Sequence, residues 1–319
     1  MIKTSINHKK LNYKAKPFLK WAGGKGQLLN TFQKFYPEEL QSNKIKNYFE
    51  PFIGGGAVFF DIVQRFEIES AYLYDVNEEL ILAYKVIQKD VFKLMDFLSL
   101  FQKKYDKLDT ENRTKLFYEI RQEFNTERFN IDYKKYSDNW IYRTAQIIFL
   151  NKTCFNGLFR FNLKGGFNTP AGRYKNPKIL DEGNLQKVSE LLQIAVVKNT
   201  DFKLVKQDLK ENSFVYFDPP YRPISKTSSF TAYSKNGFGD IQQAELANTF
   251  ELLNSKGAQL MLSNSDPKNT DPADNFFDDL YIKHHIYRVA AKRMINSNAA
   301  KRAAINEIVV TNYPVKYIG

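Results

Sequence analysis

The segment Asp218-Pro219-Pro220-Tyr221 contains residue types that can activate an amino group. It follows the apolar run 214–217, which predicts a buried strand with Asp218 at its carboxyl end, where open α/β sheets bind ligands. Both prolines lack an N–H group and have a fixed φ, so the turn presents carbonyl acceptors instead of donors. The Asp218 carboxylate and the Pro219 carbonyl can therefore accept the two hydrogens of an exocyclic amine.

An aromatic amine needs this help because its lone pair is delocalised into the ring. Two acceptors favour an sp³ nitrogen and expose the lone pair for in-line attack on a sulfonium methyl group. Tyr221 adds a ring for stacking with a base, which must leave a duplex because its amino group is otherwise paired. The tetrapeptide predicts methyl transfer to such an amine, although Asp-Pro-Pro also occurs as a plain turn after a strand.

A second segment of interest is the glycine turn Gly54-Gly55-Gly56, which follows a predicted strand at 48–53. A helix is predicted after the turn, and then a strand at 71–74 that ends at Asp75. Glycines let a backbone approach a ligand and adopt positive φ. Asp75 comes 19 residues after Gly56, close to the spacing at which an acid binds ribose hydroxyls. This pattern suits NAD, FAD or S-adenosylmethionine, and a glycine turn beside a surface aspartate is the simpler alternative.

The segment Trp21-Ala22-Gly23-Gly24-Lys25 combines an aromatic face, two glycines and a cation. Together these groups could hold a methionine moiety through its carboxylate, or they could form a packed turn. Only the other motifs favour a ligand there.

One cysteine and three histidines limit the chemistry that the chain can support. Cys154 has no second cysteine with which to form an internal disulfide, and so few histidines do not easily build a zinc site. We therefore expect no metal. Because Cys154 lies outside the motifs above, the sequence also argues against methylation at cytosine C5, which requires a nucleophile.

Strands and helices alternate over much of the chain, which is typical of a doubly wound α/β sheet. Apolar spacing predicts helices at 57–65, 78–100 and 140–150. The apolar runs that predict further buried parallel strands are 194–197, 214–217, 259–263 and 308–311. The region 80–192 lacks the alternation and is predicted to be an inserted, mainly helical recognition domain. The catalytic domain is then discontinuous and comprises 1–79 and 193–319.

Lysine and arginine outnumber aspartate and glutamate by 47 to 35, and the net charge of +12 favours nucleic acid as an anionic partner. Two blocks, 139–180 and 281–306, contain no acidic residue. A solvated surface normally mixes both signs, so these blocks predict a track for DNA phosphates. Their basic residues are Arg143, Lys152, Arg160, Lys164, Arg173, Lys175, Lys178, Lys283, Arg288, Lys292, Arg293, Lys301 and Arg302.

Hydropathy gives no indication of a membrane partner. The chain contains no apolar run near the ~20 residues that span a bilayer, and its N-terminus lacks the apolar core of a signal peptide. We expect a cytoplasmic protein that acts as a monomer.

Taken in chain order, Trp-Ala-Gly-Gly-Lys, Phe-Ile-Gly-Gly-Gly and Asp-Pro-Pro-Tyr make the sequence similar to the DNA adenine methyltransferase (Dam) family of the N6-adenine D12 class. The resemblance covers almost the whole chain. It implies a Rossmann-like methyltransferase domain with Asp218, Pro219, Pro220 and Tyr221 as the catalytic residues. The residues that it assigns to an S-adenosylmethionine site are Trp21, Ala22, Gly23, Gly24, Lys25, Phe52, Gly54, Gly56, Asp75, Asp201, Phe202 and Asp218.

The resemblance also implies a DNA-reading loop formed by the segments 156–162, 166–170 and 172–174, and it extends to 228–231 and 293–297. The implied target is GATC in double-stranded DNA, read by base flipping and groove contacts. The implied DNA-binding residues are Lys20 and Arg160 at guanines, Asn156 and Pro170 at the central bases, Phe155 and Leu158 as wedges, with Asn162, Arg173 and Tyr174 elsewhere in the loop.

Three other functions share part of this pattern. Enzymes that methylate RNA adenine or protein glutamine also need acceptors around an amine, but the former usually lack a long basic insertion and the latter favour Asn in place of Asp218. A non-catalytic DNA-binding protein on a methyltransferase fold is a third possibility, and the intact Asp218 and Tyr221 argue against it. The leading hypothesis is an N6-adenine DNA methyltransferase, either solitary or part of a restriction-modification system.

Overall fold

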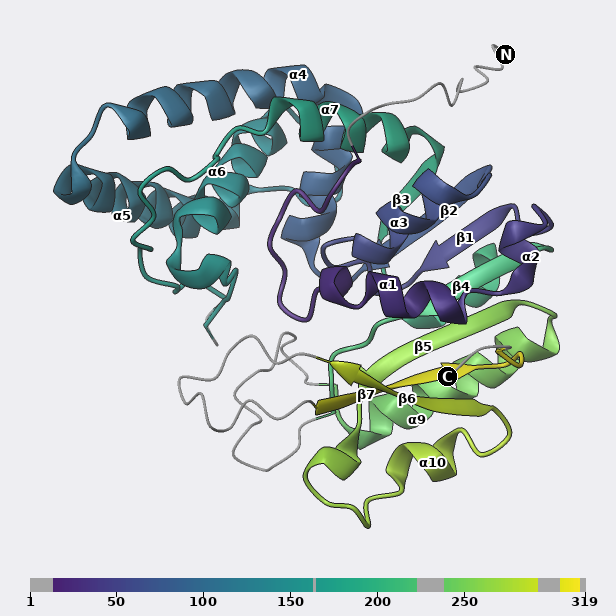
Figure 1. Cartoon of the computed structure of the whole chain (residues 1–319). Coiled ribbons are helices and arrows are strands. Elements are labelled where there is room, and N and C mark those ends of the chain that lie inside the picture. Colours follow the sequence, from purple (N-terminus) through teal and green to yellow (C-terminus); the bar gives the residue numbers. More distant parts are fainter. Residues whose placement is uncertain (1–13, 163–164, 223–237, 292–304, 316–319) are drawn as a thin grey trace, which may run out of the picture.

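The computed structural model describes residues 14–162, 165–222, 238–291 and 305–315 (Figure 1). Within these ranges seven strands form one sheet in the order β3-β2-β1-β4-β5-β7-β6. The α/β, Rossmann-like fold predicted from the sequence is confirmed. The strands are β1 (Asn47–Glu50), β2 (Ser70–Asp75), β3 (Ala195–Asn199), β4 (Ser213–Phe217), β5 (Gln259–Ser265), β6 (His285–Ala291) and β7 (Ile305–Thr311).

The central strands of the sheet are parallel. β1 pairs with β2 on one side and with β4 on the other, so Asn47 lies opposite both Ser70 and Ser213. The pairs β2–β3 and β4–β5 are parallel as well. Strand order reverses between β1 and β4, and open α/β sheets bind ligands at such a switch point. The glycine turn follows β1 and Asp218 follows β4, so both motifs lie at that point.

The predicted parallel strand at 308–311 has the wrong direction, because β7 runs antiparallel between β5 and β6. An apolar run shows that both faces of a strand are covered, but it carries no information on direction. In β7, Ile308 and Val310 pack into one core and Val309 packs into the other. The edge strand β6 is missing from the sequence prediction because polar residues such as His285 and Arg288 interrupt its apolar pattern.

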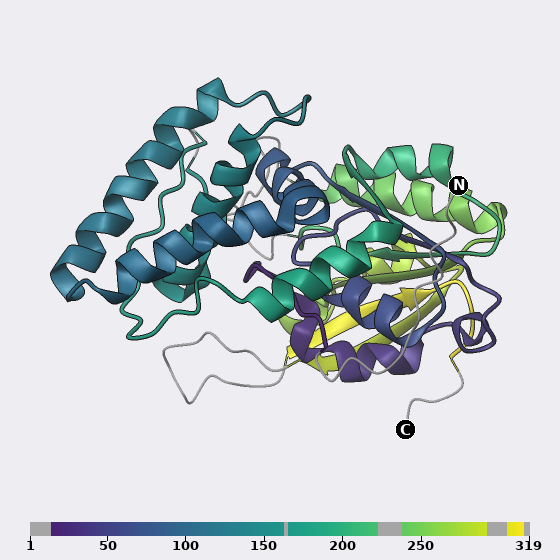
Figure 2. The same cartoon turned by 90° about the horizontal axis from the view of Figure 1, so that it is seen from above.

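Helices cover both faces of the sheet (Figures 1 and 2). One core receives Tyr216 of β4 with side chains from α1, α3, α4 and α7, and the other receives Phe217 with side chains from α8, α9 and α10. Successive residues of β4 therefore enter opposite cores. The helices are α1 (Leu29–Phe32), α2 (Glu38–Gln41), α3 (Ala57–Arg65), α4 (Glu78–Asp106), α5 (Thr110–Glu127), α6 (Asn139–Thr153), α7 (Glu182–Leu191), α8 (Val205–Asp208), α9 (Asp240–Ser255) and α10 (Phe276–Leu280). The 3₁₀ helices are η1 (Lys25–Gln27), η2 (Gln33–Phe35), η3 (Arg128–Asn130), η4 (Phe155–Gly157), η5 (Leu192–Ile194), η6 (Phe202–Leu204) and η8 (Pro267–Asn269).

Helix α4 connects the sheet to the helices α5 and α6, which lie beside the sheet (Figure 1). Its first half is largely buried, and the helix contacts β2 and β3. At Asp90 the backbone leaves helical geometry, with φ −135° and ψ 40°. The Asp90 carboxylate accepts a hydrogen bond from Tyr136 and lies 3.3 Å from Lys93 Nζ. The kink lets one chain segment pack on the sheet and then extend along α6.

Arg143 of α6 requires a correction to the predicted phosphate track. Arg143 is 1% exposed, and its Nε lies 3.0 Å from Oε2 of Glu79 in a buried ion pair with α4. The guanidinium also donates to the Phe124 carbonyl and lies over the Phe124 ring in α5, and the Tyr133 hydroxyl donates to Glu79 Oε1 at 2.6 Å. This charge joins α4, α5 and α6 in the interior, so it is not available to DNA.

Candidate active site

Lys25 joins two of the three sequence motifs. Its Nζ lies 2.6 Å from Asp218 Oδ1, and it also donates to the Gly23 carbonyl at 3.0 Å. The same ammonium lies 4.6 Å from the centre of the Tyr221 ring. Lys25 is only 4% exposed, so this charge is buried and needs the carboxylate as a partner. The Trp21–Lys25 segment and the Asp218 turn therefore form one site.

Asp218 stands immediately after β4 and is half-buried. Burial raises the pKa of Asp218, while the Lys25 ammonium and the Ser263 hydroxyl oppose that rise. Ser263 Oγ lies 3.4 Å from Asp218 Oδ1 and 2.7 Å from the Tyr216 hydroxyl. These contacts favour the ionised carboxylate, which is the form that can accept hydrogens from an amine.

The glycine turn after β1 is shaped by close neighbours. Gly54 and Gly56 have φ of 46° and 72°, and a Cβ at Gly56 would lie 2.5 Å from the Tyr84 hydroxyl. That hydroxyl donates to the Gly54 carbonyl at 3.1 Å. The Trp21 indole lies on the same turn, since a Cβ at Gly54 would be 3.0 Å from Trp21 Cδ1. Glycine is needed here for both conformation and space.

Asp75 ends β2 and faces the glycine turn. Its Oδ2 accepts the Gly54 N–H at 3.2 Å, and its Oδ1 accepts the Asn77 N–H at 2.9 Å. Burial raises the pKa of Asp75 to about 6, although these backbone donors oppose the rise. The carboxylate is thus held at the end of the strand in the position at which the sequence predicts ribose binding.

Phe52 and Phe202 form an aromatic face beside the turn. Their rings stack with centroids 5.4 Å apart, and Phe238 meets both edge-on at 5.6 and 6.0 Å. Asp201 caps η6 by accepting the Lys203 N–H, and it is exposed. The structure brings Phe52 and Phe202 together, as a shared contact with a flat ligand would require. Sequence reasoning missed Phe238, which lacks a recognisable motif.

The predicted DNA-reading loop forms a turn followed by a hairpin. Asn156 in η4 has φ 56°, and the Phe155 N–H donates to the Pro170 carbonyl at 2.9 Å. Phe161 pairs with Phe167 in an antiparallel bridge, and the Asn168 N–H donates to the Arg160 carbonyl at 3.1 Å. The two arms carry the buried Phe159 and Phe167, whose rings contact Phe124 of α5, whereas Arg160 and Asn162 are exposed.

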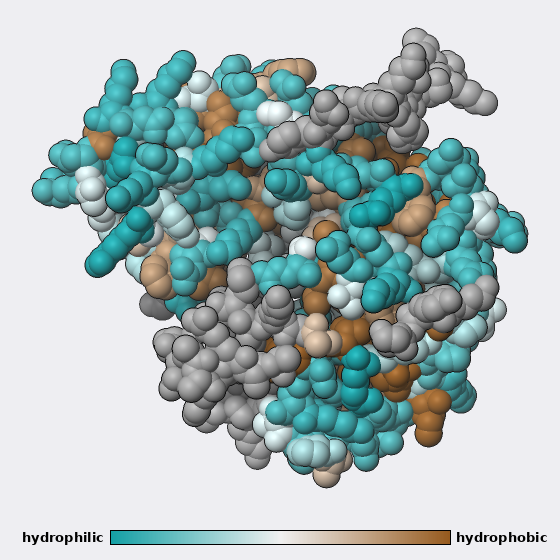
Figure 3. Space-filling view, viewed as in Figure 1, coloured by the Kyte–Doolittle hydropathy of each residue, from teal (hydrophilic) through white to brown (hydrophobic). Residues whose placement is uncertain are grey.

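Most of the implied DNA-binding residues lie on the surface. Leu158 is half-buried, whereas the exposed members of the set are Lys20, Phe155, Asn156, Arg160, Asn162, Pro170, Arg173 and Tyr174. Phe155 is 52% exposed, which is unusual for a large apolar side chain and suits a wedge. Hydrophilic residues cover much of the visible face around these elements (Figure 3). Phe155 and Arg160 are thus accessible to a large ligand.

The second acid-free block contributes less free charge than its sequence predicts. Arg288 lies in β6, and its Nε is 3.0 Å from Asp266 Oδ2, while its Nη2 is 2.8 Å from Asp278 Oδ2. Carboxylates distant in sequence therefore neutralise a residue that a local charge pattern leaves unpaired. The residues that lie outside the described part of the chain are Lys164, Lys292, Arg293, Lys301 and Arg302, with the matched segments 228–231 and 293–297.

Three polar residues near Asp218 are not singled out by the sequence. Glu50 ends β1, is 3% exposed and accepts a hydrogen bond from the Tyr48 hydroxyl at 2.7 Å. Glu307 of β7 is 8% exposed, and its Oε2 has no hydrogen-bond partner among the described residues. Burial raises the pKa of both carboxyl groups. Glu50, Ser263 and Glu307 could have been noticed in the sequence in one way. Each is a polar residue in or beside a predicted buried strand, where a polar group needs a partner or a function.

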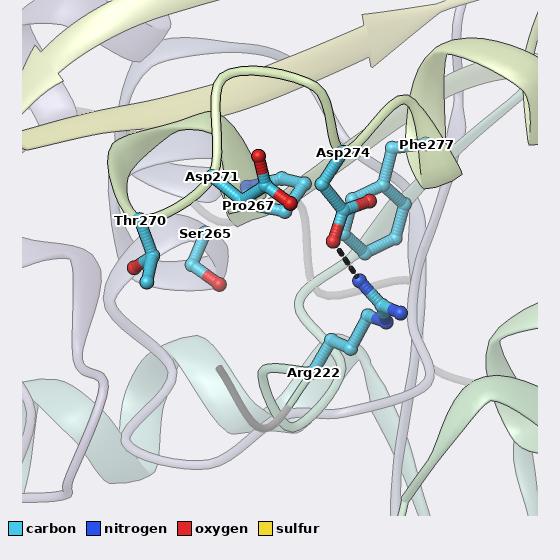
Figure 4. Close-up of a pocket in the computed structure, with 7 residues that line it drawn as sticks. All are labelled: Arg222, Ser265, Pro267, Thr270, Asp271, Asp274 and Phe277. Carbon is cyan, nitrogen blue, oxygen red and sulfur yellow. Dashed lines mark hydrogen bonds and ion pairs between the residues drawn. The ribbon is translucent and has the colours of Figure 1, made fainter. Parts of the chain in front are cut away.

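A pocket adjoins the Asp218–Tyr221 turn on the side of β5 (Figure 4). Arg222, which follows Tyr221, donates to Asp274 Oδ2 and to Asp240 Oδ1, both at 2.6 Å. Two carboxylates therefore hold the chain where it leaves the tetrapeptide. The residues that line the pocket are Arg222, Ser265, Pro267, Thr270, Asp271, Asp274 and Phe277.

No cluster of three or more His, Cys, Asp or Glu side chains suited to a metal ion occurs among the described residues. In that part of the chain, no helix combines the length and apolar character needed to cross a membrane. Cys154 is fully buried, and burial raises the pKa of its thiol to about 12, which makes it a poor nucleophile.

Comparisons with known proteins match nearly the whole chain. A family model described as D12 class N6 adenine-specific DNA methyltransferase matches residues 21–295. The type II methyltransferase M.MjaIII of Methanocaldococcus jannaschii is 48% identical over 299 residues, which cover 93% of this chain and 99% of the relative. The type II methyltransferase M1.LlaDCHI of Lactococcus lactis subsp. cremoris is 37% identical, with 93% and 95% covered. A DNA adenine methylase of Vibrio cholerae is 32% identical, with 94% and 97% covered.

Proposed function

We propose, since this chain belongs to the D12 class of N6 adenine-specific DNA methyltransferases, that it transfers a methyl group from S-adenosylmethionine to N6 of an adenine flipped out of duplex DNA. Adenine-specific DNA methylation is the activity of the family. The methyl donor, the flipping of the base and the target sequence are proposed for this chain. The 2.6 Å contact between Lys25 and Asp218 carries the proposal. It joins the segment that would hold the donor to the group that would accept hydrogens from the amine.

The residues around the switch point fit S-adenosylmethionine. Lys25 offers a cation for the methionine carboxylate, and Asp75 offers acceptors for the ribose hydroxyls. The half-buried Phe52, stacked on the buried Phe202, would present a ring to the adenine, with the exposed Asp201 immediately before Phe202. The remaining residues that we assign to the donor would surround it through the backbone and the indole ring, and they are Trp21, Ala22, Gly23, Gly24, Gly54 and Gly56.

The chain's own groups prepare the amine. When bound, S-adenosylmethionine supplies a methyl group on a positively charged sulfur. Asp218 and the Pro219 carbonyl accept the two N6 hydrogens, which directs the nitrogen lone pair away from the ring and towards the donor. Pro220 stiffens the turn, and the exposed Tyr221 ring stacks with the base. As N6 forms its bond to carbon it must lose one hydrogen, and Asp218 is the acceptor for that proton.

We assign the choice of substrate to the region 80–192 together with Lys20, and the reaction to the remainder of 1–79 with 193–319. The accessible turn and hairpin support this division, because they carry Phe155 and Arg160 on the surface. Arg160 and Lys20 would bind guanines, so that the target is GATC. We propose that a monomer performs the reaction, because the donor and acceptor residues all come from one chain.

Arg160→Ala should relax discrimination at one guanine by about 1–3 kcal/mol, because a guanidinium can bond to O6 and N7 of that base. Arg160 is exposed, and among the described residues its Nε donates to the side chain of Asn168 alone, at 3.1 Å, so the substitution should not unfold the hairpin. The measurement is kcat/KM on duplexes that differ at one base. Lys175→Ala, which removes an exposed charge from the same block, should weaken binding to all sequences alike. The same uniform loss in Arg160→Ala would mark a phosphate contact instead.

Donor affinity should fall as pH is lowered through about 6, by up to about tenfold per unit, because Asp75 binds ribose in its ionised form. Its raised pKa of about 6 places protonation within an accessible range, and the carboxylate is ionised above that value. Calorimetric titration with S-adenosylmethionine between about pH 5 and pH 8 measures the effect. Asp75→Asn should bind more weakly and lose the slope. A slope that persists in this variant would assign the titration to another group.

The function itself is tested by tritiated methyl transfer from S-adenosylmethionine to unmethylated duplex DNA, RNA and protein in parallel. Label should enter DNA alone and be recovered as N6-methyladenine. Label confined to RNA or protein would refute the proposed substrate. Sequencing that detects modified adenines in DNA from cells that express the chain then gives the motif, and modification outside GATC would correct the specificity while leaving the reaction in place.

A role in a restriction-modification system is the more strongly supported context. Two relatives, at 48% and 37% identity, are named type II methyltransferases, whereas the DNA adenine methylase of Vibrio cholerae is 32% identical. We therefore propose that the enzyme protects DNA against an endonuclease of the same specificity. Plasmid DNA from cells that express the chain should resist an endonuclease blocked by N6-adenine methylation at the mapped motif.

A further inference from the structure

Residues 14–24 reach the first helical turn without entering a helix or strand, yet Phe18 and Leu19 are 3% and 2% exposed. A buried backbone outside regular structure needs partners for its N–H and C=O groups. Side-chain amides supply them here. Gln64 bonds to both backbone groups of Ala15, and other amides do the same further along the segment. Figure 1 shows this segment, in purple, running from beside α7 down to α1.

Asn151 provides the last of these amides and is 2% exposed in α6. Its Oδ1 accepts the Lys20 N–H at 2.8 Å, and its Nδ2 donates to the Lys20 carbonyl at 2.8 Å. The second hydrogen of Nδ2 goes to the Gly157 carbonyl at 3.2 Å. One side chain therefore fixes the backbone of Lys20 and the end of turn η4 together.

Gly157 makes the same connection by packing. It has φ 67°, and a Cβ there would lie 2.6 Å from Lys20 Cδ, so the lysine stem crosses the turn directly above this residue. The turn also carries the exposed Phe155 and Asn156. The residue after Lys20 is Trp21, whose ring centroid is 6.1 Å from that of Phe159 in the hairpin. Lys20 thus has its side chain at the turn and its main chain continuing into the segment that ends at Lys25.

We propose that Asn151 is a positioning residue that couples recognition of the target sequence to methyl-donor binding. By fixing the Lys20 backbone, it aims the ammonium at a base next to η4 and sets the path of the donor segment that begins at Trp21. This inference rests on the proposed function, since it needs Lys20 to contact a base and Lys25 to hold the donor.

Asn184 of α7 offers a matched control. It is 4% exposed, accepts the Lys16 N–H at 2.8 Å and donates to the Lys16 carbonyl at 3.0 Å. Asn184 therefore makes with Lys16 the same type of paired backbone hydrogen bonds that Asn151 makes with Lys20, four residues earlier and away from η4. Asn184→Ala and Asn151→Ala delete the same atoms and the same pair of bonds to the segment. A difference between them isolates what Asn151 does at η4.

The experiment compares the two variants in the full-length protein. For each we measure donor affinity, and kcat/KM on the mapped target and on duplexes with one base changed. Asn151→Ala should lose about tenfold of the discrimination at one guanine, the scale of one lost base contact, and should bind donor several-fold more weakly. Asn184→Ala should change both quantities less than threefold. In a Lys20→Ala background, Asn151→Ala should lower discrimination no further, because both act on the same base.

The outcomes distinguish a failure of the proposed function from a failure of the role assigned to Asn151. If the parent protein methylates no DNA, the proposed function fails before the variants matter. If the parent is active but both asparagine variants lose discrimination equally, or neither does, Asn151 is only structural and the proposal is wrong. Thermal melting checks the folding of each variant. Should Asn151→Ala not fold, Asn151→Asp keeps the volume and the acceptor for the Lys20 N–H, and it must show the same loss at the same guanine.

Discussion

Asp218→Ala is expected to remove methyl transfer while donor and DNA binding stay within a few-fold of the parent protein. In the proposed mechanism the deleted carboxylate is the acceptor for the reacting amine, and its hydrogen bond would strengthen as the nitrogen becomes nucleophilic. Loss of one polar group that acts in this way lowers kcat by about 10²–10³. We expect at least that loss in single-turnover rates, which report the chemical step without product release.

Binding should survive this substitution because Lys25 remains. The ammonium loses a partner 2.6 Å away and, in the proposed site, can then pair with the donor carboxylate, so calorimetry should show donor affinity that is unchanged or higher. Asp279→Ala, which removes an exposed aspartate from α10, controls for the change in net charge. Activity of Asp218→Ala within a few-fold of the parent would refute the role of this residue. Loss of donor and DNA binding together would mean that Asp218 supports the fold of the site.

The meeting of the glycine turn and Asp218 could be predicted from sequence. Each follows a short apolar run, and the carboxyl ends of neighbouring parallel strands meet at one edge of a sheet. The structure places these runs in the adjacent strands β1 and β4. Asp75 follows the same rule at the end of β2. Local pattern was sufficient for these residues because strand ends are fixed by topology.

The position of Lys25 could not be predicted in this way. It precedes the first strand, in a segment with no periodicity, and its contact with Asp218 spans almost two hundred residues of sequence. Glu307 reaches the same area from the antiparallel strand β7, whose direction an apolar run does not encode. Charge patterns failed for a related reason: the carboxylates that pair with Arg288 and Arg143 lie outside the acid-free blocks, so a local run of basic residues does not show that these charges are already paired.

Arg143→Met should lower the free energy of unfolding by about 3–5 kcal/mol, because it leaves the Glu79 carboxylate buried without its cation. Arg143 and Glu79 are 1% and 8% exposed, and the guanidinium also bonds to the Phe124 carbonyl. Methionine fills much of the volume of the arginine stem, so the loss reports charge more than packing. Urea denaturation followed by fluorescence of the buried Trp140, in the same helix, measures the change.

The double variant Glu79→Gln with Arg143→Met decides whether the loss is electrostatic. Glutamine removes the unpaired charge and can still accept the Tyr133 hydroxyl, which donates to Glu79 Oε1 at 2.6 Å. More than half of the lost stability should return, since a buried ion pair is often replaceable by neutral groups of similar size although neither partner can be removed alone. If the double variant is no more stable than Arg143→Met, packing around α4, α5 and α6 accounts for the effect. If Arg143→Met itself stays within about 1 kcal/mol of the parent, water must reach Glu79 and the interior there is wetter than its burial indicates.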